Sequence, residues 1–171
     1  MYKLYLFLFM ATVSVAQNNP VVAPHLSEPV ELVKEVNNPD LVKIRNRVTD
    51  DLLNTTIDQT AINKLIQSQK PDGSWADINY LDVSRTGFQH SEHLANMLVL
   101  AQAFKQKDSP FKNKKNVKKA FSTALDFWLD HDFICDNWWW NEMGTPGRMI
   151  DILLVMDKDL TERQHLNCWP C

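Results

Sequence analysis

Residues 136–156 read DNWWWNEMGTPGRMIDILLVM and say more about the fold than any other part of the sequence. Three consecutive tryptophans, Trp138, Trp139 and Trp140, stand there among polar residues. They cannot all face one core, because neighbouring side chains point in different directions in a helix or a strand. We therefore predict that at least one indole is partly exposed. The alternative interpretation is that these tryptophans close a helical hairpin as core residues.

An exposed indole among amide side chains favours one kind of ligand. Its flat face packs against the apolar C–H face of a sugar ring, and its N–H can donate to a hydroxyl. Asn137 and Asn141 flank the tryptophans, and each offers donors and an acceptor that suit hydroxyls or a carboxylate. The segment is therefore a candidate carbohydrate-binding site.

The second half of the same stretch predicts a helix from Thr145-Pro146 through Met156, with Thr145 as the cap and Pro146 in the first position. Apolar residues recur with helical spacing in four further segments upstream. These segments are residues 40–53, 57–66, 90–105 and 116–130. Asp40 is expected to cap the first of them, and residues 75–89 and 133–144 are expected to be loops.

These helices predict an all-α fold of antiparallel hairpins. Helices of this length are marginal alone in water, so they must be stabilised by packing against one another. The chain has 171 residues, of which 44% are hydrophobic, which suits one domain with a real core. It has only four glycines, and its β-branched residues do not alternate with polar ones, so the sequence disfavours a β-sandwich.

The charge pattern is nearly balanced except at one place. The net charge of −3 gives no reason to expect nucleic acid or an anionic membrane surface as a partner. Five lysines nevertheless gather around the start of the helix predicted at 116–130, where positive charge opposes the helix dipole. They are Lys112, Lys114, Lys115, Lys118 and Lys119. Two interpretations stay open, a basic rim for a polyanionic glycan and a solvated surface turn.

The remaining polar motifs favour structural roles. In Gln69-Lys70-Pro71-Asp72-Gly73-Ser74-Trp75, glycine can supply a positive φ, and the tryptophan is expected to fold back over the helix end. His90 and His93 stand three apart beside Glu92, but no further ligand follows at metal-binding spacing. We therefore expect no metal and no cofactor.

The N-terminus predicts export. A lysine is followed by an apolar run from Leu4 to Val15, and Ser14-Val15-Ala16 fits a signal-peptidase site. The run is too short for a permanent membrane span, although a buried core helix is an alternative. We expect residues 1–16 to be a signal peptide, residues 17–39 to be an extended leader, and the mature chain to be secreted or periplasmic, without a membrane span.

The C-terminal residues 161–171 contain two of the three cysteines. Cys168 and Cys171 form a C-x-x-C pair, but neither a strand-then-helix context nor a second cysteine pair accompanies it. With Cys135 the count is odd, so at least one thiol is expected to be unpaired. We expect these residues to form a frayed, divergent tail.

Residues 61–160 resemble the N-terminal α/α-toroid domain of the family 8 polysaccharide lyases. The matching pieces are QKPDGSWADINY at 69–80, the segment 93–104 with its trailing Lys-Asp-Ser, and DNWWWNEMGTPGRMIDILLVM at 136–156. The Gln-x3-Gly-x-Trp turn also occurs in other α/α-toroids, including triterpene cyclases, whereas the third piece is more specific to the lyases. The resemblance implies an incomplete α/α toroid at residues 40–160.

The resemblance also implies which residues bind substrate. In that family an Asn-Trp-Trp motif lines the cleft and stacks sugar rings, and Asn137, Trp138 and Trp139 match it. Trp140 stands where relatives vary, and Gly147 and Arg148 depart slightly from the usual pattern. The implied partner is an anionic polysaccharide such as chondroitin or hyaluronan, cleaved by β-elimination at the uronate.

The family's reaction needs an amide, a base and an acid, which come from later helices as Asn, His, Tyr and Arg. Tyr80 matches the structural tyrosine after the Gly-x-Trp turn, and the histidines match no catalytic segment. We therefore expect a truncated lyase that keeps the glycan-stacking cluster and lacks the catalytic centre. The alternatives are a non-catalytic carbohydrate-binding domain and a non-functional remnant.

Overall fold

The computed structural model describes residues 38–131 and 133–168, so the predicted signal peptide and most of the leader lie outside the described residues. Every regular element in this part of the chain is helical, which confirms the all-α prediction. The helices are α1 (Pro39–Leu53), α2 (Gln59–Ser68), α3 (His90–Lys105), α4 (Lys115–His131), α5 (Thr145–Met156) and α6 (Glu162–Cys168). A π-helical turn, η1 (Trp140–Gly144), precedes α5, and a 3-10 turn, η2 (Asp157–Asp159), follows it.

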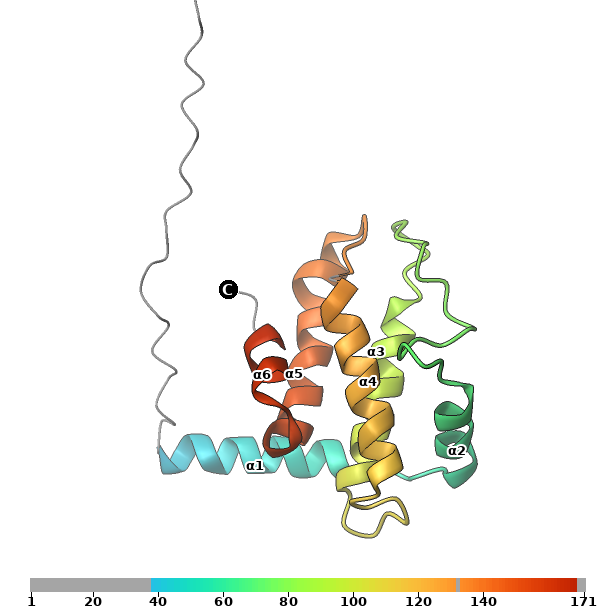
Figure 1. The fold of residues 1–171 in the computed structure, drawn as a ribbon. Helices are drawn as coiled ribbons and strands as arrows, with labels where there is room; N and C mark the ends of the chain where they lie inside the picture. Colours follow the sequence, from blue (N-terminus) through green and yellow to red (C-terminus); the bar gives the residue numbers. More distant parts are fainter. Residues whose placement is uncertain (1–37, 132, 169–171) are drawn as a thin grey trace, which may run out of the picture. The chain divides into compact units, whose positions relative to one another are not determined.

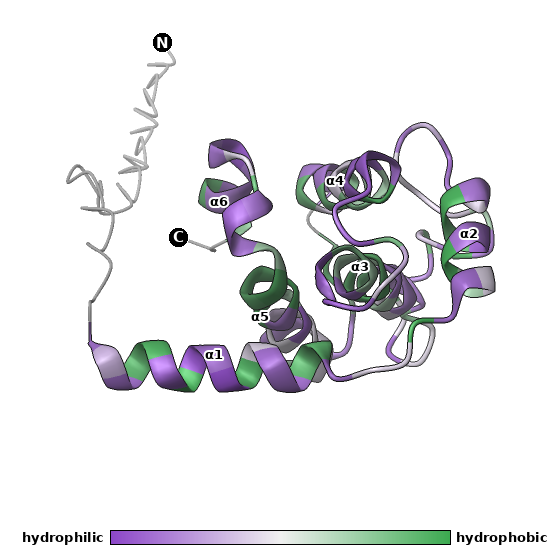
Figure 2. Cartoon of the chain, turned by 90° about the horizontal axis from the view of Figure 1, so that it is seen from below, coloured by the Kyte–Doolittle hydropathy of each residue, from purple (hydrophilic) through white to green (hydrophobic). Residues whose placement is uncertain are grey.

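Helices α3, α4 and α5 run along one another and form the centre of the domain, with α1 lying across one end (Figure 1). Figure 2 looks along these helices. In this view α2 lies on one side of α3, and both α4 and α5 lie on the other. Nine residues of α3 are buried, including Leu94, Met97 and Leu100. Burial of this many apolar side chains is the main source of stability for helices this short. No helix in the described ranges has the length and apolar character needed to cross a bilayer.

Helix α1 has no fully buried residue, but Leu52 and Leu53 at its end pack against the core, and polar contacts add to this attachment. Gln102 of α3 donates to the carbonyl of Leu52 at 2.8 Å, and Gln106 donates to that of Leu53 at 3.0 Å. These amides satisfy carbonyls at the end of α1 that have no partner inside the helix. The predicted cap was wrong by two residues: Asn38 accepts from the Asp40 amide at 2.9 Å, which leaves Pro39 in the first turn.

The turn at 69–75 has the structure that its sequence predicts. Gly73 adopts φ +98°, and Trp75 is buried with its indole N–H donating to the Leu65 carbonyl at 3.0 Å. Trp75 therefore folds back over α2. A β-carbon on Gly73 would lie 2.2 Å from the Thr123 carbonyl oxygen, so α4 also requires glycine at this position.

The predicted loop at 133–144 was wrong in its second half. Helical backbone already begins at Trp138, runs through η1 and enters α5 without a break. Pro146 has no N–H and cannot bond to the carbonyl four residues earlier. In the wider turn before it, the Thr145 amide donates to the Trp140 carbonyl, five residues back. Pro146 is therefore accommodated inside a helix, and Thr145 is not a cap.

The expectation of a frayed tail was also wrong for residues 162–168, which form α6. Thr161 and Gln164 cap this helix reciprocally: the Gln164 side chain accepts from the Thr161 amide at 3.0 Å, and Thr161 Oγ1 accepts from the Gln164 amide at 3.3 Å. The Gln164 amide group also donates to Ser122 Oγ at 2.9 Å and to Asp126 at 3.0 Å on α4. These contacts anchor α6 to the domain.

Candidate functional site

Asn137 controls the backbone at the start of the tryptophan segment. Its Oδ1 accepts from the Trp139 amide at 3.1 Å, which makes it the cap of the helical turn that follows. Its Nδ2 donates to the Arg85 carbonyl at 3.2 Å. The Asp136 amide donates to the Val83 carbonyl at 2.8 Å beside it. Two loops far apart in sequence are thereby joined at one end of the domain (Figure 1).

The three tryptophans divide between solvent and core, as predicted. Trp138 is 64% exposed and Trp139 is 47% exposed. Trp140 is half-buried and packs against the core, with its ring 5.7 Å from that of Phe88. Trp139 meets Trp140 edge to face at 5.0 Å. Two indoles are therefore exposed, and the third packs between Trp139 and the core.

Gly144 makes room for this arrangement. A β-carbon at Gly144 would lie 2.4 Å from Cε3 of Trp140 and 2.7 Å from Cζ3 of Trp139. Real β-carbons do not approach other heavy atoms so closely, so any larger residue would displace the rings. The positions of the Trp139 and Trp140 rings thus depend on the glycine of the Met-Gly-Thr-Pro sequence, a signal that sequence reasoning overlooked.

The two joined loops and the start of η1 carry further exposed apolar side chains besides the two indoles. We call this surface the tryptophan rim, and it comprises Leu81, Val83, Arg85, Ile134, Asn137, Trp138, Trp139 and Met143. Leu81 is 92% exposed and Ile134 is 63% exposed, which is unusual for side chains of this size. Arg85 contributes an exposed positive charge. The rim therefore combines flat apolar surface with a cation.

Asn141 has a structural role. Its Nδ2 donates to the Cys135 carbonyl at 2.8 Å, and its Oδ1 accepts from the Cys135 amide at 3.1 Å. With both ends of its amide engaged by one residue, Asn141 fixes the bend that precedes Asn137. Of the two asparagines that flank the tryptophans, only Asn137 lies at the rim.

His90 and His93 lie in the core, packed among aromatic rings. His93 Nε2 donates to the Ala124 carbonyl at 3.0 Å, so its Nδ1 accepts from the Tyr80 hydroxyl at 2.9 Å. Burial lowers the pKa of His93 to about 4, and burial likewise lowers the pKa of His90. Both rings are neutral at pH 7. No set of three histidine, cysteine or acidic side chains in the described ranges is placed to hold a metal ion.

The two described cysteines are buried. Cys135 and Cys168 are not joined in a disulfide. Burial, with Asp126 nearby, raises the pKa of the Cys168 thiol to about 11. A redox-active C-x-x-C needs a thiol with a lowered pKa, so Cys168 is unsuited to that chemistry.

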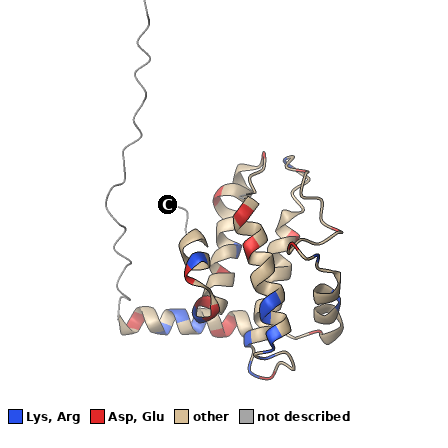
Figure 3. Cartoon of the chain, viewed as in Figure 1, with Lys and Arg blue, Asp and Glu red and all other residues tan. Residues whose placement is uncertain are grey.

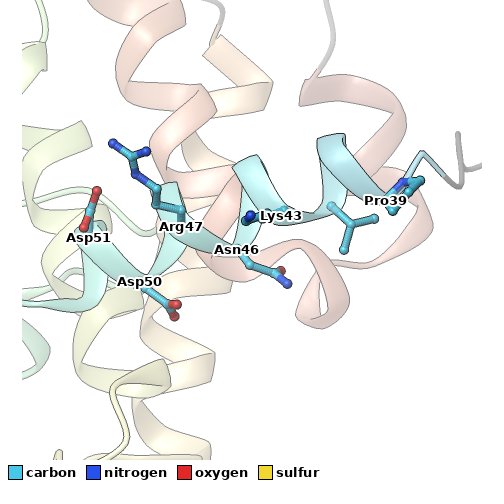
Figure 4. A pocket seen from close by; sticks show the side chains of 7 residues that line it. Pro39, Lys43, Asn46, Arg47, Asp50 and Asp51 are labelled. Atoms are coloured by element: carbon cyan, nitrogen blue, oxygen red, sulfur yellow. The ribbon is translucent and has the colours of Figure 1, made fainter.

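A shallow hollow also follows one face of α1, away from the rim (Figure 4). Its lining comes from that helix alone, between Pro39 and Asp51, and mixes Lys43 and Arg47 with Asp50. Along the helix the basic Lys43 and Arg47 come first, and the acidic Asp50 and Asp51 follow. The hollow therefore carries charges of both signs and favours neither an anion nor a cation.

The lysine cluster lies at the other end of the domain. Its residues surround the turn between α3 and α4, whereas the rim follows the C-terminal end of α4 (Figure 3). Helix α4 has 17 residues and separates the two surfaces by about 25 Å. The lysines therefore do not form a basic rim around the exposed tryptophans.

The all-helical fold agrees with one family of proteins. The family model for polysaccharide lyase family 8, N-terminal alpha-helical domain, matches residues 32–168. The chain belongs to this family. As a family 8 domain it is similar to Chondroitinase-AC of Pedobacter heparinus, with 34% identity over 93 residues, which are 54% of this chain and 13% of that protein.

The family 8 domain is also similar to a solved structure of chondroitinase AC lyase, from a study of its active site in complexes with oligosaccharides. The TM-score is 0.67 at 30% identity, covering 73% of this chain and 19% of the solved one. This similarity confirms the expected α/α-toroid class. The chain spans between about an eighth and a fifth of the length of these relatives.

Proposed function

We propose that this chain is the glycan-holding N-terminal part of a secreted polysaccharide lyase that cleaves uronate-containing glycans by β-elimination. Family membership and the similarity to Chondroitinase-AC support the reaction class. The N-terminal sequence 1–16 supports export, because it has the pattern of a signal peptide. Chondroitin, hyaluronan or a related polymer is the expected substrate.

The observation that carries the proposal is the tryptophan rim. Trp138 and Trp139 expose their indoles at adjacent positions, while the Asn137 cap and η1 hold the backbone beneath them. A rigid pair of indoles loses little conformational freedom on binding, so sugar rings can stack on it at low entropic cost. Arg85 supplies a positive charge that suits the carboxylate of a uronate or a sulfate group.

Asn137 acts in this proposal mainly by positioning. Both ends of its amide are engaged, with the Trp139 amide and the Arg85 carbonyl. It still brings a polar edge to the rim, because an amide oxygen has a second lone pair and the NH₂ group a second hydrogen. Its first effect is to fix the two indoles and the Arg85 loop relative to each other.

We further propose that the chain alone does not catalyse elimination. Elimination requires a base and an acid that can reach the substrate. Tyr80, His90 and His93 are held inside the aromatic core, and Tyr80 has its pKa raised to about 12 by burial. His131 bonds to the Phe127 carbonyl, and His165 bonds to that of Asp157. Each tyrosine and histidine side chain in the described ranges thus makes at least one hydrogen bond within the protein.

The experiment is a pair of measurements on the purified chain with size-defined chondroitin oligosaccharides. Tryptophan fluorescence should report binding, and the ultraviolet absorbance of unsaturated uronate should not rise. Trp138→Ala or Trp139→Ala should weaken binding about fivefold, since one aromatic contact is worth about 1 kcal/mol. Ile44→Ala is the matched control, because it shortens an exposed apolar side chain on α1.

Two results would contradict the proposal. Equal affinity in wild type, Trp138→Ala and Trp139→Ala would show that the rim does not bind sugar. Unsaturated product that appears with wild type and disappears with Trp138→Ala would show that the chain is an active lyase by itself. Binding without product is also the behaviour of a non-catalytic carbohydrate-binding domain, the second candidate that the exposed indoles favour.

A further inference from the structure

The turn between α3 and α4 has the strongest local charge in the described part of the chain. We call residues 105–119 the lysine-rich turn, and they contain seven lysines and one aspartate. The whole chain has 18 basic residues and a net charge of −3. More than a third of its positive charge is therefore concentrated in this segment, at the end of the domain where α4 begins (Figure 3).

Two of the seven lysines share one carboxylate within the protein. Asp159 bonds to Lys105 at 2.7 Å and to Lys118 at 2.9 Å, and Lys118 also lies over the Phe104 ring at 6.0 Å. The other five have exposed side chains and no ion pair within the described ranges. These five are Lys107, Lys112, Lys114, Lys115 and Lys119. The turn therefore keeps a large uncompensated charge.

The backbone that carries these charges is fixed by hydrogen bonds. The Asn113 amide donates to the Phe104 carbonyl at 3.0 Å and thereby closes the turn, and Asn113 itself adopts φ +56°. The Lys112 amide donates to the Ser109 carbonyl at 3.1 Å, and the Lys114 amide donates to that of Phe111 at 3.0 Å. The lysines thus project from a preorganised surface, which lowers the entropic cost of binding.

These lysines do not help the fold. The exposed Lys114 and Lys115 lie at the positive end of the α4 dipole, where acidic residues would stabilise the helix, and the first turn of α4 has none. Repulsion between neighbouring lysines adds to this unfavourable effect. An anionic ligand on the turn would offset both. The charge is therefore better explained by a binding role than by stability.

We infer that the lysine-rich turn is a second contact for the anionic polysaccharide, at the opposite end of the domain from the tryptophan rim. This inference rests on the proposed function for the identity of the polymer. Ammonium groups are point charges on flexible stems, so they recognise carboxylate or sulfate density rather than one sugar. A polymer long enough to span about 25 Å along α4 can occupy both surfaces, and a short oligosaccharide cannot.

The experiment compares two triple variants of the full chain. Lys112→Gln/Lys114→Gln/Lys115→Gln removes three charges from the turn. Lys43→Gln/Lys64→Gln/Lys70→Gln removes three exposed lysines elsewhere and gives the same net charge. Affinity is measured for long chondroitin sulfate and for a short oligosaccharide at low and at raised salt. Melting temperatures establish that both variants are folded.

The turn variant should bind the long polymer about tenfold more weakly at low salt, since each exposed ion pair contributes a factor of two to three. Its affinity should also depend less on salt. Its affinity for the short oligosaccharide should be unchanged, and the control variant should match wild type with both ligands. This pattern would establish the turn as a polymer contact.

Other patterns overturn the inference in distinguishable ways. Equal losses in both triple variants would mean that bulk charge alone matters. If the turn variant binds the polymer as tightly as wild type while Trp138→Ala loses oligosaccharide binding, the inference about the turn is rejected and the proposal for the rim stands. Tight binding of phosphatidylserine vesicles that competes with the polymer through the turn would assign it to an anionic membrane surface instead. If the turn variant binds the polymer more weakly while Trp138→Ala binds like wild type, the turn is supported as a contact and the rim is rejected.

Discussion

The Tyr80 hydroxyl donates to Nδ1 of His93 at 2.9 Å and also accepts from the Trp75 amide at 3.1 Å. The opposite side of the His93 ring donates to the Ala124 carbonyl at 3.0 Å. One hydroxyl and one imidazole therefore connect the 69–80 segment, α3 and α4 in a single buried chain of hydrogen bonds. Such chains are costly to interrupt, because each buried polar group left without a partner loses its solvation.

Removal of the hydroxyl should test that connection. Tyr80→Phe leaves His93 Nδ1 and the Trp75 amide without partners, so the free energy of unfolding should fall by about 1–3 kcal/mol. Urea unfolding measures it, with Ser68→Ala as a control for loss of an exposed hydroxyl. A change in Tyr80→Phe no greater than in the control would mean that this hydrogen-bond chain adds nothing to stability.

His93 should make the domain sensitive to acid. Burial lowers its pKa to about 4 in the folded state, against about 6.5 when unfolded. Between these values the unfolded chain binds a proton that the folded chain does not. Stability is therefore full above pH 6.5 and falls as the pH is lowered toward 4, by up to about 3 kcal/mol. Burial lowers the pKa of His90 too, which adds in the same direction.

The measurement is the free energy of unfolding at several values between pH 7.5 and 4.5, for wild type and His93→Gln. The variant should be less stable at pH 7.5 but should lose less stability on acidification. Titration of Asp72 does not interfere between pH 7.5 and 4.5. The Ser74 amide lowers the pKa of Asp72 from 3.8, so the stability that Asp72 contributes is lost only at lower pH. Identical slopes in the two proteins would exclude His93 as the group that titrates.

Local sequence was sufficient wherever a helix is defined by its own apolar pattern. The helix expected at 90–105 has those bounds as α3, because nine of its residues face neighbouring elements and their spacing is unambiguous. Asp58 caps α2 by accepting from the Thr60 and Ala61 amides, a polar residue directly before the helix of the kind that favours a cap. The exposed indoles were also foreseeable, since three adjacent side chains cannot share one direction.

Long-range contacts explain what the sequence did not predict. Pro146 favours a helix start locally, but the wider η1 turn lets the helix begin at Trp138 instead. Asn137 and Asn141 cannot be told apart from the sequence, and only their partners distinguish their roles. Asn137 bonds to Arg85 and positions the rim, whereas Asn141 bonds to Cys135 and fixes the bend. Helix α6 did have a local signal, the capping box Thr161-Glu162-Arg163-Gln164, which a tail-like composition obscured.

Substitutions at Asn137 should separate its two bonds. Asn137→Asp keeps an oxygen that can accept from the Trp139 amide but loses the donor to Arg85. Asn137→Ala loses both, so it should lower the free energy of unfolding by about 1 kcal/mol more than Asn137→Asp, the usual value of a helix cap. Glycan titration of both variants adds a second readout. Equal stability of the two variants would mean that the cap is unimportant.

A pair of glycines should show how closely the rim depends on its backbone. Gly144→Ala places a β-carbon 2.4 Å from the Trp140 ring and 2.7 Å from that of Trp139, so the indoles must move. Gly147 lies three residues further along, in α5, where a β-carbon meets nothing within 4 Å. Gly147→Ala should therefore be neutral or stabilising by up to about 1 kcal/mol, the helix propensity difference.

The two variants add the same methyl group to one continuous helical segment, so their comparison isolates the effect on the rings. Gly144→Ala should change the tryptophan emission spectrum and the near-ultraviolet circular dichroism, and should weaken oligosaccharide binding about as much as Trp139→Ala. Gly147→Ala should retain the spectra and the affinity of wild type. If both variants bind sugar and fluoresce like wild type, the indoles adjust freely to the added methyl group. In that case the placement of the rings by η1 is not required for sugar binding at the rim.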